Sequence, residues 1–515
     1  MVIQTISGTA VNKMRIAPLS KSQYLRGLQC HKSLWLLKGK KIKPRPPDDF
    51  LQAIFDEGTR VGEEAQKLFP GGKLIEFEGS SFEEKINKTK EYLASGESTI
   101  YEATFKFNDI LVMVDILNKG KSGWNFYEVK SATDIYKDQS LNVKDVYVKD
   151  VAIQYYVLKG SGLDIASAFL VHIDNKYVRK GPLEVNKLFA KRELTDEVVE
   201  MQREVIGELG AIRKTLGGNE PAIDIGVHCD NPYECNFKDH CWPDEILNEY
   251  SVFNISGLNS SKKFELYQSG VIKLADVPDD FPLSDNQRLQ VETELSGEEI
   301  IEQEHIKNFL NDLSYPLYFL DFETFNQAIP QWDGLRPYQN VPFQYSIHCI
   351  ELEGEGPSHL EFLAEEDSDP RRSLAERLIG HIPKGVCVLA YNCSFEKGVI
   401  RYLAEQFPDY SKHLMDIHDN LLDLMVPFQK KYYYKKEMKG RYSIKTVLPA
   451  LFSDSPYSKM EINEGMKASN NYKNLASIQD SKKKEKIKRD LKIYCKQDTQ
   501  SMIDILGRLM AVVAK

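Results

Sequence analysis

Long apolar runs are absent from this sequence, and their absence excludes a helix that crosses a membrane. The apolar stretches that do occur are short, such as "ILVMV" at residues 110–114 and "VCVLAY" at residues 386–391. A membrane span needs about 20 consecutive apolar residues. The N-terminal stretch "MVIQTISGTAVNKMRIAP" also lacks the apolar core of a secretory signal. We therefore expect a cytoplasmic protein with no membrane partner.

Positive charge is in deficit as well. The chain has 67 lysines and arginines against 76 aspartates and glutamates, which gives a formal net charge of −9. This balance excludes a protein that binds polyanions through its overall charge, although basic residues can still gather locally. A phosphate-binding motif of the G-x-x-x-x-G-K-[ST] type is also missing, so any unwinding of a duplex would have to come from a partner protein.

Cysteine is scarce, yet three of the eight cysteines fall within the stretch "HCDNPYECNFKDHCW" at residues 228–242. In a reducing cytosol, clustered cysteines are expected to be metal ligands or catalytic groups before they are disulfides. Cys229, Cys235 and Cys241 leave a fourth ligand to be found, and the adjacent His228 and His240 could complete a zinc site. The remaining cysteines are Cys30, Cys349, Cys387, Cys393 and Cys495.

The chain is too long for one hydrophobic core, and its periodicity predicts two α/β patterns. The first has helices at 20–37, 50–68, 81–96 and 145–160, three strands within 98–131, and a strand at 165–173. The second has strands at 315–325, 342–351, 358–364 and 386–391, with helices at 371–381, 395–406 and 482–510. Residues 250–307 carry no strand signal and predict a small helical module, which leads into a charged helix at 295–313. We therefore expect domains at 1–248, 249–310 and 311–515.

Two carboxylates and a lysine form the first chemical pattern. Asp115 in "MVDIL" and Glu128 in "YEVK" lie on consecutive predicted strands, so both can project from one side of a hairpin. Lys130 follows Glu128 by two positions and shares its face. Such a group suits a magnesium-dependent phosphodiesterase, in which the acids hold the cation and the lysine orients water or offsets phosphate charge. The alternative is a surface hairpin with ordinary charges.

This spacing and the predicted order of elements resemble the PD-(D/E)XK nuclease core. The later segment "AIQYY" resembles the Gln/Tyr helix of the RecB-like branch, and the resemblance implies site roles for Gln154 and Tyr155. That branch usually carries a histidine on the early helix. The corresponding stretch here, "GTRVGEEAQKLF", has no histidine, and Glu64 is the residue that could substitute for it.

The positions of the cysteines carry a second resemblance. One cysteine upstream, Cys30 in the N-terminal helix, and the triplet downstream bracket the RecB-like core. This arrangement resembles the iron–sulfur nucleases of the AddB helicase-nuclease and CRISPR-adaptation kinds, and it implies a structural [4Fe–4S] cluster on four thiolates. The downstream spacing departs from the usual Cys-x2-Cys-x5-Cys, because both gaps here are five residues. Zinc therefore stays the alternative.

A third pattern consists of acids in the second α/β region. "FLDFETF" places Asp321 and Glu323 on one face of a strand, "YNCSFEKGVIRYL" places Glu396 at a strand-to-helix passage, and "YCKQDTQSM" places Tyr494 and Asp498 on one helix face. Four carboxylates from three elements can bind two magnesium ions for in-line phosphodiester cleavage.

This third pattern resembles the DEDD exonucleases of the tyrosine-bearing subtype, which have a ribonuclease H-like (DnaQ-type) fold. The resemblance implies that the acids bind metal and that Tyr494 positions the attacking water. The third acid is normally an aspartate, whereas this chain has Glu396. The alternative is a folded but inactive domain that binds or scaffolds.

Residues 429–445, "QKKYYYKKEMKGRYSIK", mix seven Lys/Arg residues with four tyrosines. Such a segment could contact phosphates by charge and bases by stacking.

Taken together, the whole chain resembles a bacterial family of uncharacterised proteins with an N-terminal RecB-like nuclease, a short helical linker and a C-terminal ribonuclease H-like exonuclease domain. The resemblance implies a Mg- or Mn-dependent nuclease that hydrolyses DNA phosphodiester bonds, as an exonuclease, in DNA repair, recombination or defence. Its partners would be nucleic acid and a helicase or another repair or defence protein. The alternatives are a nucleic-acid-binding scaffold with inactive centres, or an RNA-directed exonuclease acting through the C-terminal domain.

Overall fold

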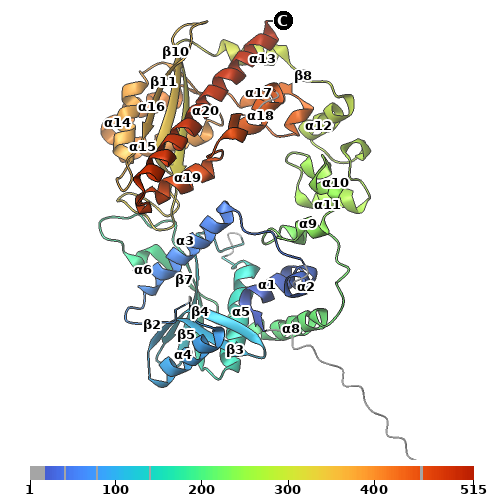
Figure 1. The fold of residues 1–515 in the computed structure, drawn as a ribbon, viewed down its shortest axis with the longest axis vertical. Coiled ribbons are helices and arrows are strands. Elements are labelled where there is room, and N and C mark those ends of the chain that lie inside the picture. The colour runs from blue at the N-terminus through green and yellow to red at the C-terminus, as the bar shows by residue number, and fades with distance from the viewer. Residues whose placement is uncertain (1–17, 40–41, 77–78, 138–140, 453–455, 515) are drawn as a thin grey trace, which may run out of the picture. The chain divides into compact units, whose positions relative to one another are not determined.

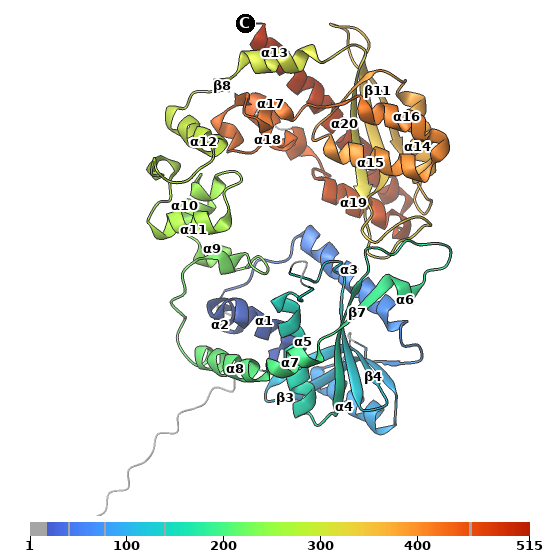
Figure 2. The ribbon, with the colours of Figure 1, turned by 180° about the vertical axis from the view of Figure 1, so that it is seen from behind.

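The computed structural model describes residues 18–39, 42–76, 79–137, 141–452 and 456–514. They form a mixed α/β fold with a seven-stranded sheet, a five-stranded sheet and a two-stranded sheet (Figures 1 and 2). The chain divides into two compact units, named here the N-terminal and C-terminal units. The N-terminal unit comprises the described residues of Met1–Pro46, Phe55–Tyr177 and Leu183–Cys241, and the C-terminal unit comprises those of Pro47–Ile54, Val178–Pro182 and Trp242–Lys515.

The N-terminal sheet has the strand order β2-β3-β4-β5-β6-β7, and β1 pairs with β4. Its strands are β1 Leu19–Ser20, β2 Lys73–Leu74, β3 Thr99–Phe107, β4 Ile110–Lys119, β5 Trp124–Lys130, β6 Ile165–Ile173 and β7 Phe189–Glu193. β3, β4 and β5 form an antiparallel meander, and β6 returns parallel to β5. Asn108 and Asp109 join β3 to β4 with positive φ angles of 50° and 57°, which a two-residue hairpin turn requires.

The helices of the N-terminal unit supply the rest of its core. They are α1 Lys21–Gln29, α2 His31–Gly39, α3 Asp49–Gln66, α4 Phe82–Ala94, α5 Asp145–Gly160, α6 Val185–Leu188, α7 Thr195–Glu200, α8 Gln202–Leu216 and α9 Lys238–Cys241. The predicted order of a helix, three strands, a helix and a strand is found as α4, β3 to β5, α5 and β6. Because α5 crosses between the parallel strands β5 and β6, one of its faces is packed onto the sheet.

The helix predicted at 20–37 is broken, and the break falls at Cys30. Ser20 caps α1 through a capping box with Gln23, but Cys30 adopts extended angles of φ −158° and ψ 114°. The two helical segments pack closely, since a Cβ on Gly27 would lie 2.8 Å from side-chain atoms of Leu34 and Ile212. The prediction of one continuous helix is therefore wrong, and Cys30 lies at a bend between two helices.

The C-terminal unit is built on a sheet of order β11-β10-β9-β12-β13. Its strands are β9 Leu317–Phe325, β10 Val341–Ile350, β11 Ser358–Leu363, β12 Cys387–Ala390 and β13 Leu421–Asp423. β9, β10 and β11 are antiparallel to their neighbours, whereas β12 runs parallel to β9 and β13 runs parallel to β12.

Helices cover both faces of this sheet (Figures 1 and 2). They are α14 Arg371–His381, α15 Ser394–Gln406, α16 Pro408–Asp419, α17 Val426–Gln429, α18 Ile444–Phe452, α19 Gly465–Asn474 and α20 Ser481–Val513. Leu320 and Phe322 of β9 pack with α14, α15 and α16, while Leu317 and Phe319 pack with α18 and α20. Since alternate residues of a strand face opposite sides, Asp321 lies on the α20 face.

The region of the chain between the two large sheets departs from the prediction at two points. Its elements are α10 Asp244–Leu247, α11 Ser260–Gln268, α12 Asp285–Ser296, β8 Ile300–Ile301 and α13 Gln303–Asn311. The helix predicted at 295–313 is wrong, because α12 ends before Gly297, whose left-handed φ of 70° terminates it. β8 also pairs with β14 Tyr433–Tyr434, in a region predicted to lack strands.

Residues of α11 and α12 have a small hydrophobic core of their own, which includes Val252, Leu266 and Val291. The chain from Trp242 onward belongs to one compact unit, so the division into units does not separate residues on either side of 310/311. The boundary expected there stays a prediction. Among the described helices, none combines the length and hydrophobicity that crossing a bilayer requires.

Candidate functional site

The predicted first centre lies at the open end of the β4–β5 hairpin. Ile116 is opposite Tyr127 in the antiparallel register, so Asp115 and Glu128 occupy the next positions along the two strands. The backbone N–H of Val129 donates to Asp115 Oδ2 at 2.6 Å. The structure therefore brings the two predicted acids together, with Glu128 buried and Asp115 partly buried.

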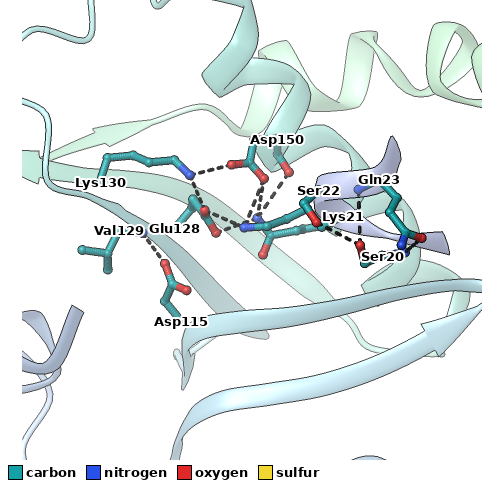
Figure 3. Close-up of polar contacts among 10 residues, drawn as sticks. Ser20, Lys21, Ser22, Gln23, Asp115, Glu128, Val129, Lys130 and Asp150 are labelled. Atoms are coloured by element: carbon teal, nitrogen blue, oxygen red, sulfur yellow. Dashed lines mark hydrogen bonds and ion pairs between the residues drawn. The ribbon is translucent and has the colours of Figure 1, made fainter. Parts of the chain in front are cut away.

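Two lysines and a second aspartate complete this centre (Figure 3). Lys21 and Lys130 each donate to Glu128 Oε1 at 2.6 Å. Asp150 of α5 lies between the same two ammonium groups, with Oδ2 2.6 Å from Lys130 Nζ and Oδ1 3.1 Å from Lys21 Nζ. Sequence reasoning missed Lys21 and Asp150. The position of Asp150 could have been found, because it precedes Gln154 by four residues and so shares its helix face.

Gln154 lies where the resemblance places it. Its Nε2 donates to Glu128 Oε2 at 2.7 Å, and its Oε1 has no hydrogen-bond partner among the described residues. Tyr155 packs instead against the hydrophobic core of the unit. Glu64, considered as a substitute for the missing histidine, pairs with Lys67 at 2.7 Å.

The electrostatics of the first centre shift the pKa values of its two strand carboxylates, Asp115 and Glu128, in opposite directions. Burial, and then the negative charge of Glu128, raise the pKa of Asp115 well above its usual range. Burial also acts to raise the pKa of Glu128, but the ammonium groups of Lys130 and Lys21 outweigh it and hold that pKa below its ordinary value. Burial and the charge of Glu128 raise the pKa of Glu102 to about 7. Glu128 is therefore the carboxylate that stays ionised in this arrangement.

The four predicted cysteines are brought together in the N-terminal unit. Burial raises the pKa of the Cys241 thiol to about 11, and the charges of Cys235, Cys30 and Cys229 act in the same direction. Two local contacts hold the group. The backbone N–H of Cys235 donates to the carbonyl of Cys229 at 2.8 Å, and the Gln29 side chain donates to the carbonyl of His228 at 2.8 Å.

The spacing of these thiols was compared with the two proposed metals. A tetrahedral zinc ion with Zn–S bonds near 2.3 Å would hold its sulfurs about 3.8 Å apart. Among the described residues, the three ligand atoms that do lie within 4.8 Å of one another belong to Asp321, Glu323 and Cys495, and no three of the four thiols meet that distance. His240 Nε2 lies 3.2 Å from Glu220, whereas His228 Nε2 lies 3.8 Å from Cys229 Sγ, so a zinc site that includes a histidine stays an alternative.

The cysteine segment and the first centre are connected through α1. Lys21 is the first residue of this helix, and Cys30 directly follows its last residue. Tyr233, between the clustered cysteines, lies close enough to the centre for Lys130 and Asp150 to influence its phenol. Gln29 Nε2 also donates to the Tyr233 carbonyl at 2.6 Å. We therefore expect a change at the cysteines to alter the position of Lys21 in the acidic centre.

The second centre lies in the C-terminal unit, where β9 faces α20. Asp321, Glu323 and Cys495 place their ligand atoms within 4.8 Å of one another. Cys495 Sγ lies 3.7 Å from Asp321 Oδ2. Sequence reasoning missed Cys495 as a member of this group, although it precedes Asp498 by three positions and therefore lies on the same helix face.

Tyr494 and Asp498 both join the second centre through hydrogen bonds. Lys445 donates to Tyr494 Oη at 2.8 Å, and Tyr457 donates to Asp498 Oδ1 at 2.6 Å. Lys445 and Tyr457 come from the segment between α17 and α20, for which the sequence suggested no role in the centre. They show that this segment contributes to the second centre.

Glu396 is buried at the start of α15, and its Oε2 has no hydrogen-bond partner among the residues the structure describes. It lies close enough to raise the pKa of both Asp321 and Glu323. Asp423, the last residue of β13, holds the turn before α15. Its carboxylate accepts from the backbone N–H groups of Asn392 at 2.9 Å and Cys393 at 3.1 Å.

All four acids of the second centre have raised pKa values. Burial is the largest cause for each, and mutual repulsion adds to it for Asp321 and Glu323. Burial raises the pKa of Asp498 to about 6, and burial with the charge of Asp423 raises the pKa of Glu396 to about 8. This pattern is typical of a group of carboxylates that a cation would stabilise.

Two of the four tyrosines in the basic and aromatic segment at 429–445 are buried, while Tyr432 and Tyr442 are partly exposed. Tyr433 and Tyr434 form β14 and are 0% and 1% exposed. Lys431 is also buried, at 6% exposure. These tyrosines are therefore unavailable to stack on a base, and Lys445 at the end of the segment points to Tyr494 instead.

Two comparisons with known proteins bear on the chain. Residues 318–443, from β9 to just beyond β14, match a family described as "Domain of unknown function (DUF2779)". The matched segment contains Asp321, Glu323 and Glu396. A protein of Ureaplasma parvum serovar 3 described as "Uncharacterized protein UU173" is 27% identical over 216 residues, which is 37% of this chain and 31% of that relative. Over part of its length, the chain is thus similar to proteins whose descriptions state no activity.

Proposed function

We propose that this protein is a metal-dependent nuclease that hydrolyses DNA phosphodiester bonds, acting as an exonuclease. The observation that carries the proposal is the second centre. There, carboxylates from β9, α15 and α20 converge in a largely buried site, and Glu396 keeps an oxygen without a hydrogen-bond partner among the described residues. Burying repelling acids is costly unless a cation is bound.

The topology of each unit supports the proposal. The order β11-β10-β9-β12-β13, with three antiparallel strands followed by two parallel ones, agrees with a ribonuclease H-like exonuclease domain of the DEDD type. The succession α4, β3, β4, β5, α5 and β6 agrees with a RecB-like PD-(D/E)XK core. Since folds host many functions, the argument rests on the sites.

In the second centre, Asp321, Glu323, Glu396 and Asp498 would hold Mg²⁺ or Mn²⁺. Such a cation supplies Lewis-acid stabilisation of the phosphoryl oxygens and lowers the pKa of bound water. Tyr494 would position the attacking water through its hydroxyl, which Lys445 fixes by donating to it. Tyr457 orients Asp498 through its own hydrogen bond.

In the first centre, Asp115 and Glu128 would hold the cation. Lys130 would orient the water and offset the charge of the phosphate, while Gln154 fixes the second oxygen of Glu128. The charges of Glu128, Asp150, Lys21 and Lys130 balance one another in the structure.

The four clustered cysteines, Cys30, Cys229, Cys235 and Cys241, would hold a structural [4Fe–4S] cluster, with zinc as the alternative. The resemblance to iron–sulfur nucleases is what favours the cluster. The cluster would fasten the bend between α1 and α2 to the segment before α9, which keeps two distant parts of the chain together. This role requires no redox chemistry.

The protein would act in the cytoplasm on nucleic acid, in DNA repair, recombination or defence. A helicase or another repair or defence protein would be its partner, since the sequence has no nucleotide-binding motif for unwinding.

Hydrolysis of end-labelled single- and double-stranded DNA, with matched RNA, in the presence of Mg²⁺ or Mn²⁺ tests the proposal. Asp321→Asn and Asp115→Asn remove an acid from one centre each. Asp504→Asn on the exposed side of α20 and Asp109→Asn in the β3–β4 turn are the matched controls. We expect at least one centre variant to lose cleavage by about a hundredfold or more, with both controls unchanged.

If neither centre variant changes the rate, this assignment of the sites is wrong. Tight DNA binding without turnover in any divalent metal would instead support a scaffold with inactive centres. Preferential cleavage of RNA that depends on Asp321 would make RNA the substrate of the C-terminal unit.

A further inference from the structure

Both oxygens of Glu128 are engaged by this chain's own side chains. Oε1 accepts from Lys21 and Lys130, each at 2.6 Å, and Oε2 accepts from Gln154 at 2.7 Å. A divalent cation bound through Glu128 must therefore replace at least one of these donors. The question is which donor leaves.

The two ammonium groups differ in their attachment. Lys130 stands two residues after Glu128 on β5 and shares its face of the sheet. Lys21 is the first residue of α1 and reaches Glu128 and Asp150 from the side opposite Lys130 (Figure 3), close enough for its charge to lower the pKa of Asp115. A cation held between Asp115 and Glu128 would thus meet Lys21 first. The side chains of Lys21 and Lys130 are 22% and 24% exposed, so both have a route into solvent, and the choice between them rests on the effect of Lys21 on Asp115.

The backbone of Lys21 is fixed even though its side chain can move. Leu19 and Ser20 pair with Ile110 and Leu111 of β4, the strand that carries Asp115. Ser20 Oγ then caps α1 by accepting from the Gln23 N–H at 3.2 Å. These contacts hold the Lys21 ammonium over the centre without requiring any metal.

We propose that Lys21, which pairs with Glu128 and Asp150, is a built-in cation that competes with the divalent metal for Glu128. Metal binding at the first centre then requires the Lys21 side chain to leave, and Lys21 sets the metal concentration at which the centre fills. Lys21 acts through the two carboxylates and is therefore a positioning residue. The inference rests on the proposed function, because it takes the first centre to be a metal site.

The test measures Mn²⁺ affinity by isothermal titration calorimetry, independently of cleavage. The parent for every variant is the full chain carrying Asp321→Asn and Glu323→Gln, which removes binding at the second centre. Lys21→Met deletes the charge at similar length, and Lys21→Gln serves if the methionine variant does not fold. We expect Mn²⁺ to bind about tenfold more tightly in either variant, because a repelling charge a few ångströms away is gone.

Two controls keep the charge or remove it elsewhere. Lys21→Arg should bind Mn²⁺ about as the parent does. Lys88→Met deletes an exposed lysine that pairs with Glu91 on α4, and it should leave the affinity unchanged. Asp115→Asn in the same parent shows whether the measured Mn²⁺ is bound at the first centre.

A lysine with a merely structural role would give the opposite sign, since its loss would disorder the carboxylates and weaken Mn²⁺ binding. Equal or weaker Mn²⁺ binding in Lys21→Met and Lys21→Gln, with binding still dependent on Asp115, overturns the inference and leaves the proposed function standing. Mn²⁺ binding that does not depend on Asp115 in any variant overturns the metal site itself, and the inference with it.

Discussion

In the first centre, Glu128 shares one oxygen with two ammonium groups, whereas in the second centre Glu396 is buried with an oxygen that lacks a hydrogen-bond partner among the described residues. Lysine charges lower the pKa of Glu128, while burial raises the pKa of Glu396 to about 8. One centre is charge-balanced from within. The other concentrates uncompensated acids.

The difference teaches that similar acid patterns can differ in their need for a cation. In the first centre, a metal must displace Lys21. Its attraction to Glu128 then replaces the attraction between Lys21 and Glu128, so the net gain in Coulomb energy is only partial. In the second, the nearby ammonium of Lys445 is bonded to Tyr494 and to the Asn463 carbonyl rather than to an acid. A metal there would relieve repulsion directly, so we expect the second centre to fill at lower metal concentration.

The largest expected effect comes from the four clustered cysteines, which lie in the same unit as the first centre and not in the unit of the second. Cys30→Ala should release the metal as fully as Cys235→Ala, because both thiols belong to one group, and structural metals are worth on the order of 10 kcal/mol in small domains. Iron and zinc content and visible absorption after anaerobic purification measure this loss. Cys349→Ala, in the buried sheet of the C-terminal unit, is the control and should keep the metal. Full metal retention in Cys30→Ala would contradict the ligand set.

Glu396→Gln should weaken the pH dependence of stability that comes from the second centre. Folding raises the pKa of Glu396 from 4.5 to about 8, so the folded state holds a proton that the unfolded state loses. The metal-free parent should therefore lose stability as the pH rises from about 4.5 to about 8. Since a tenfold change in proton affinity is about 1.4 kcal/mol, the loss is up to about 5 kcal/mol.

Thermal melts with chelator across this pH range measure the difference between Glu396→Gln and the parent. The variant should match the parent below pH 4.5 and exceed it above pH 8. Added Mn²⁺ should then stabilise the parent more than the variant at high pH. Parallel pH profiles for the two proteins would show that Glu396 is not the titrating group.

Asp423→Asn should weaken the turn that presents Glu396. The Asp423 carboxylate accepts backbone hydrogen bonds from Asn392, Cys393 and Met425, and a bond to a charged acceptor contributes roughly 1.5–3 kcal/mol, of which a neutral amide acceptor keeps part. We expect denaturant titrations to show that the free energy of unfolding falls by about 2 kcal/mol. The rate of the cleavage that depends on Asp321 should fall as well. Asp416→Asn is the control for cleavage. Asp416 also accepts a backbone hydrogen bond, but from the N–H of Gly385.

The smallest expected effect is at Cys495, which distinguishes the two centres by ligand chemistry. A thiolate beside Asp321 and Glu323 favours softer cations than carboxylates alone do. Cys495→Ser should therefore weaken Cd²⁺ binding about tenfold relative to Mn²⁺ binding, with thiolate absorption as a second readout. An unchanged ratio of the two affinities would mean that Cys495 only packs against the acids.

Local patterns predicted much of the fold, as α5 and β6 illustrate. The expected helix at 145–160 and strand at 165–173 match Asp145–Gly160 and Ile165–Ile173, since each has a clear apolar period. The helix expected at 20–37 was wrong because nothing local marks Cys30 as a bend. Likewise, the tyrosines of 429–445 looked like a surface for bases, but Tyr433 and Tyr434 are buried by pairing with a distant strand.

By itself, the sequence determined which residue types could meet. Asp115 and Glu128 meet because they flank one hairpin, and Asp321 and Glu323 share a face because a strand has a period of two. Only the tertiary structure decided what surrounds them. Lys21 comes to Glu128 over 107 residues of chain, and Lys445 comes to Tyr494 over 49. Contacts at such separations depend on how whole elements pack, and that packing sets the charge of each centre.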